Sequence, residues 1–416
     1  KSLFDIEGSH WLAQQKAEFK IWFNWLLEIF QEASRAKKVD FLVNIFSLHK
    51  KFLEKLMIGY IPEKGWYSDI NDVKSLNNMS LPNQVFTVLS SHLNVPKRGG
   101  KVALWEYRKI VENLLAELTN TFNIENKRPD VFILLGDNIY GDTQDMKKLK
   151  DKWNDFSSIS GFKKLRQTSR LLGVWDDHDY GENDAGIEFP KKAESQKIFL
   201  DFLHEPKDSE RRKTPGTYDS VIIGPPGKRI QFILLDTRYF RTPLKRPDKR
   251  ENGKGPYVPN ESKEAKILGD IQWTWLEEVL SEPAEIRIIA SSIQLVSTSH
   301  GWETWGNFPN ERKRFINLLK EKKTKGTIIL SGDRHSAEIS KLEGALPYPL
   351  YDITSSAMNQ RQKPKFEENI HRLGNRYFEE NFGLLKIEWL PNGPKVSTSI
   401  RDITGNTVME YELGIF

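Results

Sequence analysis

The sequence predicts an α/β protein with a two-sheet β-sandwich core flanked by helices and with an N-terminal helical extension, and three observations favour it. From residue 84 onward, short apolar runs bounded by Gly and Asp alternate with segments of helical spacing. Near the carboxyl end, Asn392-Gly393 and Gly405-Asn406 separate three apolar segments, and such dipeptides favour tight hairpins. Before residue 81 the apolar residues recur only at helical spacing, which predicts an N-terminal helical extension.

We expect two regions, a helical region over residues 1–80 and an α/β domain over residues 81–416. In the first region, apolar residues from Phe19 to Phe30 and from Phe41 to Leu56 recur at helical spacing with Lys and Glu between them. Their aromatic content fits either peripheral membrane contact or a helical layer on the following domain. We favour the helical layer.

Strands and helices are expected to alternate through the second region. Apolar runs predict strands at 85–89, 131–135, 170–175, 230–235, 286–293 and 327–331. Helical spacing predicts helices at 105–121, 190–204, 272–280 and 309–320. The last three apolar segments, at 383–390, 395–401 and 407–413, predict an antiparallel meander.

Composition narrows the class of protein. The chain has 416 residues and contains no apolar run long enough to span a membrane. A net charge of +5 fits an anionic substrate, and no specific nucleic-acid motif is present. The absence of cysteine excludes thiolate catalysis and Cys-ligated metals. Because the sequence starts with Lys, we expect an exported protein that has lost a signal segment, with a cytoplasmic location as the alternative.

Acidic residues follow four of the expected strands. The segments are Gly136-Asp137-Asn138-Ile139-Tyr140, Asp176-Asp177-His178-Asp179, Asp236-Thr237-Arg238 and Asp333-Arg334-His335. Ligands of layered α/β proteins bind outside the carboxyl ends of strands, so we expect these loops to converge. Adjacent acids repel each other unless a cation or an Arg neutralises them, which favours a metal site over ordinary turn residues. Alternation also places Asp333 and His335 on one face, where a carboxylate and an imidazole suit a metal cation.

In this order, the motifs resemble those of the PhoD-like alkaline phosphatases and phosphodiesterases, a branch of the binuclear metallophosphoesterases. The further matches are Leu268-Gly269, Gln272-Trp273, Trp305, Phe308-Pro309, Glu311-Arg312, Thr354-Ser355-Ser356 and Asn381-Phe382-Gly383. The resemblance implies that residues 81–416 form a PhoD-like domain with the metallophosphoesterase-like fold. It also implies a hydrolase that cleaves phosphate mono- or diesters with a metal-bound hydroxide. Its expected substrate is a small phosphate ester or a phospholipid.

The resemblance also implies the roles of individual residues. The expected metal ligands are Asp137 as the bridge, Tyr140 as a phenolate ligand of iron (Fe3+), Asn183 as an amide ligand of calcium (Ca2+), and Asp177, Asp333 and His335. Other divalent ions are the alternative to this metal pair. The expected catalytic and substrate-binding residues are His178, Asp177 and Arg238. The chemistry agrees, since oxygen ligands suit hard cations, Arg binds phosphate in a bidentate manner and His protonates a leaving alkoxide.

One segment departs from the family pattern. The family supplies a metal ligand from a first strand that ends in Gly-Ser-Cys or in Asp, whereas the counterpart here is Val88-Leu89-Ser90-Ser91-His92. Ser90 or Ser91 replaces the thiol, His92 contributes instead, or the true strand is missing. This departure favours a degenerate phosphate-binding module as one alternative function. The aromatic N-terminal helices favour another, a phospholipase D-like phosphodiesterase directed at phospholipids. The polar loops 204–217 and 241–266 are expected to be solvated, and the alternative for the second is that it borders the substrate entrance.

Overall fold

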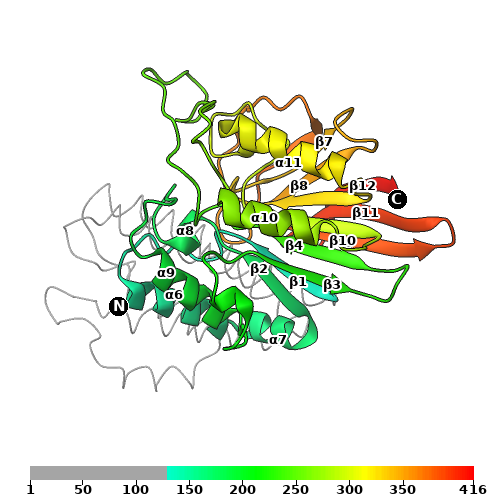
Figure 1. Ribbon diagram of the computed structural model, residues 1–416, viewed down its shortest axis with the longest axis horizontal. Coiled ribbons are helices and arrows are strands. Elements are labelled where there is room, and N and C mark those ends of the chain that lie inside the picture. Colours follow the sequence, from blue (N-terminus) through cyan, green and yellow to red (C-terminus); the bar gives the residue numbers. More distant parts are fainter. Residues whose placement is uncertain (1–128) are drawn as a thin grey trace, which may run out of the picture. The chain divides into compact units, whose positions relative to one another are not determined.

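The computed structural model describes residues 129–416 (Figure 1). The predicted helical region at 1–80, the strand at 85–89 with Ser90, Ser91 and His92, and the helix at 105–121 lie outside the described residues. Their predictions therefore stay predictions.

A seven-stranded sheet forms the largest layer, in the order β3-β4-β5-β6-β8-β7-β9 (Figure 1). The strands are β3 (Asp219–Ile223), β4 (Ile230–Leu234), β5 (Ile286–Ala290), β6 (Thr327–Ser331), β7 (Ala337–Leu342), β8 (Leu350–Ser355) and β9 (Arg372–Tyr377). Strands β4, β5, β6 and β8 run parallel, while β3, β7 and β9 are antiparallel to their neighbours. Every residue of β5 is buried, as a parallel strand covered on both faces requires.

Two smaller sheets accompany it. Strands β1 (Val131–Leu135) and β2 (Arg170–Val174) pair in parallel, with Val131 opposite Arg170. Strands β10 (Asn381–Leu390), β11 (Gly393–Asp402) and β12 (Thr407–Ile415) form the antiparallel meander that the turn dipeptides predict. The strands of the described part of the chain thus form three hydrogen-bonded sheets rather than the two expected.

Alternate residues of the central strands point into two hydrophobic cores. Phe232 and Leu234 of β4 share one core with Val174 of β2 and Val396 of β11, so both smaller sheets lie against the same face. Ile233 points to the opposite face, which packs against helices α10 (Gly269–Val279) and α11 (Pro309–Glu321). Figure 1 shows these two helices over the sheet. The prediction of an α/β fold is confirmed.

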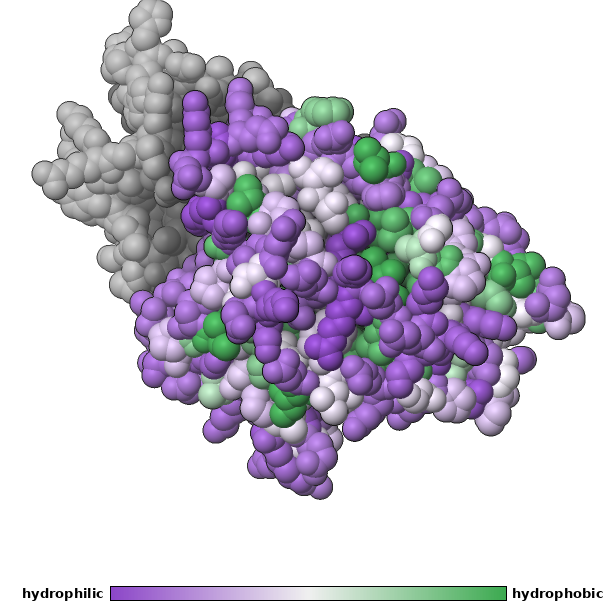
Figure 2. Space-filling model, turned by 45° about the horizontal axis from the view of Figure 1, so that its top comes forward, coloured by the Kyte–Doolittle hydropathy of each residue, from purple (hydrophilic) through white to green (hydrophobic). Residues whose placement is uncertain are grey.

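A group of helices accompanies β1 and β2. They are α6 (Met146–Ser158), α7 (Ser160–Thr168), α8 (Asp177–Tyr180) and α9 (Lys192–Phe202), with a short 3-10 turn at η3 (Glu210–Arg212). A second 3-10 turn, η4 (Trp305–Asn307), contacts α11 instead. Their core is aromatic, and Trp153 of α6 packs on Phe199 and Phe202 of α9. Figure 2 shows a mostly hydrophilic surface with hydrophobic residues in small groups. Among the described residues, no helix has both the length and the apolar character that membrane crossing demands.

Candidate metal centre

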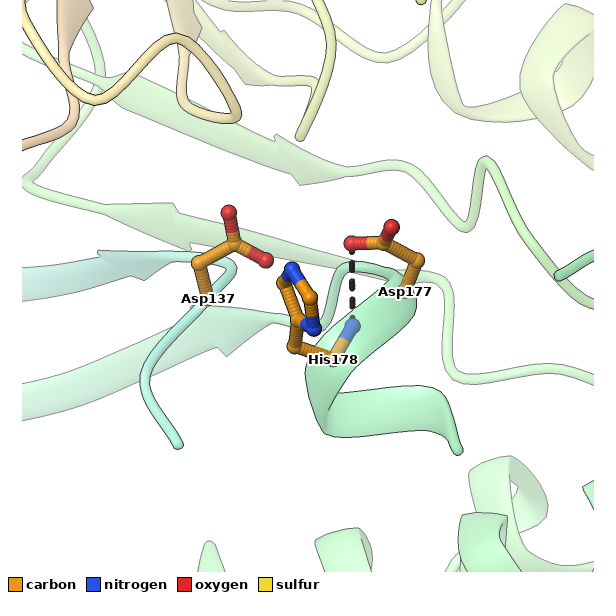
Figure 3. Close-up of side chains that lie close together, drawn as sticks. All are labelled: Asp137, Asp177 and His178. Atoms are coloured by element: carbon orange, nitrogen blue, oxygen red, sulfur yellow. Dashed lines mark hydrogen bonds between the residues drawn. The ribbon is translucent and has the colours of Figure 1, made fainter. Parts of the chain in front are cut away.

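The loops after β1, β2 and β6 bring acidic residues together. The ligand atoms of Asp137, Asp177 and His178 all lie within 4.8 Å of one another (Figure 3). The same holds for the carboxylate oxygens of Asp137, Asp176 and Asp333. Asp137 belongs to both groups, which is the position that a bridging carboxylate requires. Sequence reasoning expected the loops to converge, and the structure brings them together.

The backbone of these loops adopts an unusual conformation. Asp137, Asp333 and His335 have positive φ angles of 52°, 63° and 48°. Residues other than Gly seldom adopt this left-handed backbone conformation, and those that do concentrate at functional sites. Gly136 precedes Asp137 with φ of 96°, and a Cβ atom there would lie 2.5 Å from the Cβ of Asp176. Only Gly therefore allows the β1 loop to approach the β2 loop this closely.

Charge and burial at these loops fit a bound cation. Within residues 129–416, Asp137 Oδ1 and Asp176 Oδ2 are buried without a hydrogen-bond partner. Burial, together with the charges of Asp177 and Asp176, raises the pKa of Asp137 well above its usual value. Burial likewise raises the pKa of Asp333 to about 7. Buried carboxylates that lack partners are stabilised when they coordinate a hard cation.

Tyr140 and His335 lie on one side of Asp137. The Tyr140 hydroxyl is 2.9 Å from Nε2 of His335, and that nitrogen is 3.4 Å from Asp137 Oδ2. Burial and the charge of Asp137 raise the pKa of Tyr140 well above 10. A phenolate at Tyr140 therefore requires a strongly charged cation beside it. The structure brings these three sequence-predicted ligands together.

His178 makes a close contact with an exposed acid. Its Nδ1 lies 2.7 Å from Oδ1 of Asp142. Burial lowers the pKa of His178, but the hydrogen bond that its Nδ1 donates to Asp142 and the charge of Asp177 outweigh burial and raise this pKa to about 9. His178 thus holds a proton at neutral pH in this arrangement, as a proton donor must.

Arg238 is fully buried between two acids. Its Nε donates to Asp176 Oδ1 at 2.5 Å and its Nη1 donates to Glu303 Oε2 at 2.6 Å. Arg241 also pairs with Glu303, at 2.9 Å from Nε to Oε1. The phosphate-binding role expected for Arg238 stays a prediction, because both bonds already go to carboxylates of the protein.

A third acidic group involves residues to which sequence reasoning assigned no role. Oxygens of Asp177, Asp184 and Glu303 lie within 4.8 Å of one another. The predicted ligand Asn183 is exposed, whereas the amide of the next residue, Asp184, donates to Asp177 Oδ2 at 2.7 Å. Asp184 follows the acidic segment Asp176-Asp177-His178-Asp179 in the same loop region and directly follows the predicted ligand Asn183. Glu303 follows no apolar run, so nothing in its local sequence pattern indicated it.

Asp236 has a different role from the other acids at strand ends. It is fully buried and accepts hydrogen bonds from the backbone amides of Thr217, Arg238 and Tyr239. These three hydrogen bonds satisfy the backbone N–H groups of residues that lie outside the strands. Asp236 therefore fixes the backbone around Arg238.

Comparison with known proteins places the chain among phosphatases. The model of the PhoD-like phosphatase family matches residues 117–367. Alkaline phosphatase D of Bacillus subtilis (strain 168) is 26% identical over 214 residues, which span 46% of this chain but only 36% of that relative. A solved structure of PhoD matches with a TM-score of 0.53 and 16% identity, covering 72% of this chain and 70% of that one, and shows a shared fold. A purple acid phosphatase from yellow lupin (Lupinus luteus) seeds matches with a TM-score of 0.49 and 11% identity, covering 72% of this chain and 49% of that one.

Proposed function

Because this chain belongs to the PhoD-like phosphatase family, we propose that it is a metal-dependent hydrolase of phosphate mono- or diesters. The observation that carries the proposal is the place of Asp137 in two acidic groups at once, with a buried oxygen that has no partner among the described residues. Two cations held there would share Asp137.

The residues around Asp137 suit two different cations. Tyr140, His335 and Asp333 offer a phenolate, an imidazole and a carboxylate, a set that suits iron (Fe3+). Asp177 and Asp184 offer carboxylate oxygens, to which Asn183 would add the amide oxygen that the family resemblance implies; oxygen ligands suit calcium (Ca2+). When bound, such cations offset the negative charge of the phosphate and lower the pKa of a water molecule.

His178 is proposed to protonate the leaving oxygen. Asp142 engages its Nδ1, so Nε2 is the nitrogen that remains to deliver a proton. The hydrogen bond also fixes the orientation of the imidazole ring, as a second acid does for many catalytic histidines. The family resemblance also implies a catalytic role for Asp177. In this proposal Asp177 donates no proton, but it lies beside His178 and favours the charged form of the imidazole.

The proposal is tested with the purified full chain after removal of metals by a chelator. We expect addition of iron and calcium to the metal-free protein to restore hydrolysis of p-nitrophenyl phosphate, of bis-p-nitrophenyl phosphate, or of both. Asp137→Asn, which alters the shared ligand, should abolish the restored activity, while Asp151→Asn on the exposed face of α6 should not. Phosphate binding without metal-dependent turnover of either ester would contradict the proposal and favour a binding module.

A further inference from the structure

Three cationic side chains from separate loops surround Trp302. The Nζ of Lys365 lies 4.4 Å from the centre of the indole ring, and the guanidinium carbons of Arg250 and Arg334 lie at 5.4 and 6.0 Å. We call these four residues the Trp302 cluster. An indole face attracts cations, so the ring holds the three positive charges together despite their mutual repulsion.

The cluster carries more positive charge than its acids neutralise. Glu367 is the carboxylate that Arg334 and Lys365 contact, at 2.8 Å each, and Arg376 pairs with the same group. Three cations thus share the buried carboxylate of Glu367, and of these Arg334 also contacts Asp333. These cations hold the pKa of Glu367 at about 2 against the effect of burial, so its charge is already present at neutral pH. The surplus positive charge favours binding of a further anion.

Several contacts place the cluster beside the metal centre. Arg334 lies between Asp333 and His335 in sequence, and its Nη1 is 3.5 Å from Asp333 Oδ2. The loop that bears Lys365 is fixed to the centre by the amide of Gln362, which donates to the carbonyl of His335 at 2.8 Å. Asn359 of the same loop donates to the carbonyl of Asp137 at 3.1 Å.

The loop that bears Arg250 is held to the segment that bears Trp302. The amides of Gly255 and Tyr257 donate to the carbonyls of His300 and Gly301, at 2.8 Å each. The Tyr257 hydroxyl donates to Asp184 of the third acidic group. Two loops that are far apart in sequence are therefore both anchored to the metal centre and meet at Trp302. For the loop that bears Arg250, within 241–266, the sequence had indicated a border of the substrate entrance as an alternative role. For the loop that bears Lys365 it had indicated no role.

We propose that the Trp302 cluster binds a second anionic group of the substrate, so that the protein prefers phosphate esters whose alcohol portion itself carries a phosphate. The inference rests on the proposed function, since the first phosphate must occupy the metal centre. A phosphate presents several acceptor oxygens, which suit the guanidinium of Arg250 and the ammonium of Lys365. Arg250 is exposed and Lys365 is partly exposed, so an incoming anion reaches both.

The test compares two sugars that differ by one phosphate, fructose 6-phosphate and fructose 1,6-bisphosphate. For the unaltered chain we expect kcat/KM for phosphate release to be about tenfold higher with the bisphosphate, the effect of one added charge-assisted contact. The double variant Arg250→Met and Lys365→Met should reduce this ratio to about twofold, which reflects only the two phosphates available for cleavage. The control Lys249→Met with Lys363→Met removes the same charge from exposed positions on the same two loops and should keep the ratio.

Calorimetry of both sugars with the same variants gives a readout that does not need turnover. The bisphosphate should bind about tenfold more tightly to the unaltered chain, and the Arg250 and Lys365 double variant should lose this advantage. An equal ratio in the unaltered chain and the double variant would overturn the inference, as would an equal loss in the control. Failure of the proposed function gives another result. In that case p-nitrophenyl phosphate would not be cleaved, while the bisphosphate would still bind more tightly than the monophosphate.

Discussion

Nδ1 of His178 lies 2.7 Å from Oδ1 of Asp142, although the two residues belong to loops that follow different strands. Asp142 is exposed and is not one of the acids that gather around Asp137. We expect Asp142→Asn to retain its metals and to lose roughly 10- to 100-fold in kcat/KM, because His178 loses the group that orients it and favours its protonated form. Elemental analysis and steady-state kinetics on one preparation measure both.

His178→Ala provides the comparison for this variant. It should lose at least as much activity as Asp142→Asn, and the double variant should be little worse than His178→Ala, because Asp142 acts through His178. Additive losses in the double variant would show that Asp142 acts independently. Loss of metal in Asp142→Asn would show that this loop supports the metal centre.

Metal content and activity should fall together when a proposed ligand of the β6 loop is removed. We expect Asp333→Asn and His335→Ala each to lose bound metal and nearly all activity, because each removes a group that lies beside Asp137. Elemental analysis after desalting measures the metals. A metal content that stays unchanged in both variants would contradict the assignment, and a loss in Asp142→Asn equal to theirs would indicate that the loops form one structural unit.

Iron at Tyr140 has a spectroscopic consequence. The pKa of Tyr140 lies well above 10 in these surroundings, so its deprotonation near neutral pH depends on a strongly charged cation. We expect the iron-loaded protein to absorb visible light through phenolate-to-iron charge transfer, and Tyr140→Phe to lose this band. Tyr257→Phe, which removes a hydroxyl beside Asp184, serves as the control and should keep it. A colourless, iron-free and fully active protein would show that another metal pair operates.

The strands that carry the site could be predicted, whereas several neighbouring elements could not. Val131–Leu135 is continuously apolar and Ile328–Leu330 forms the apolar centre of β6, because both strands pack into the hydrophobic core. Strands β7 and β8 contain the buried polar residues Glu338 and Asp352, which interrupt the apolar pattern. Glu338 pairs with Arg372, a partner that only the fold supplies, so the sequence gives no local indication that it is buried.

The same limit applies to the site. The position of Asp236 after a strand resembles that of Asp137 in the sequence, yet its side chain turns toward backbone amides. Glu303 contacts Arg238 and Arg241 from a loop without an apolar run. Residue type and strand position predict which loops converge, but the direction of each side chain depends on contacts between distant segments.

Stability should depend on pH through His300. Burial, followed by the charge of Arg334, lowers the pKa of His300 well below 6.5, and Glu367, Arg376 and Lys365 are the other charged groups that face it. Its Nδ1 accepts from the amide of Trp302, so the folded protein holds the neutral ring. The unfolded chain therefore binds a proton that the folded chain does not. The contribution to stability is complete above about pH 6.5 and declines below it, by at most about 1.4 kcal/mol per pH unit.

His300→Gln tests this dependence. Denaturant unfolding of both proteins with a chelator present gives the free energy of unfolding at pH 7.5 and at pH 5.5. The difference between the unaltered chain and the variant should favour the unaltered chain at pH 7.5 and should shrink at pH 5.5, because Gln takes up no proton. A difference that is the same at both pH values would show that His300 does not titrate between them.

Arg238 should contribute more to stability than to phosphate binding. Its side chain is fully buried, and its two hydrogen bonds go to Asp176 and Glu303. Arg238→Ala leaves both carboxylates buried without this partner, which costs about 3–5 kcal/mol of unfolding free energy. Arg238→Lys should recover only part of this loss, because an ammonium cannot reproduce the planar pair of bonds.

The control for Arg238→Ala is Arg314→Ala, which removes an Arg whose side chain is 45% exposed and pairs with Glu277. Loss of such an exposed pair costs at most about 1 kcal/mol, and loss of the contact between Arg314 and the Trp273 ring adds about 1 kcal/mol more, which is still below the cost expected for Arg238→Ala. A phosphate-binding Arg238, as the family resemblance implies, gives the opposite pattern. The alanine variant would then unfold at nearly the unaltered temperature while kcat/KM fell by roughly two to three orders of magnitude. Melting temperature and kinetics measured on the same preparation distinguish the two roles, because a structural Arg238 lowers stability more than activity per folded molecule.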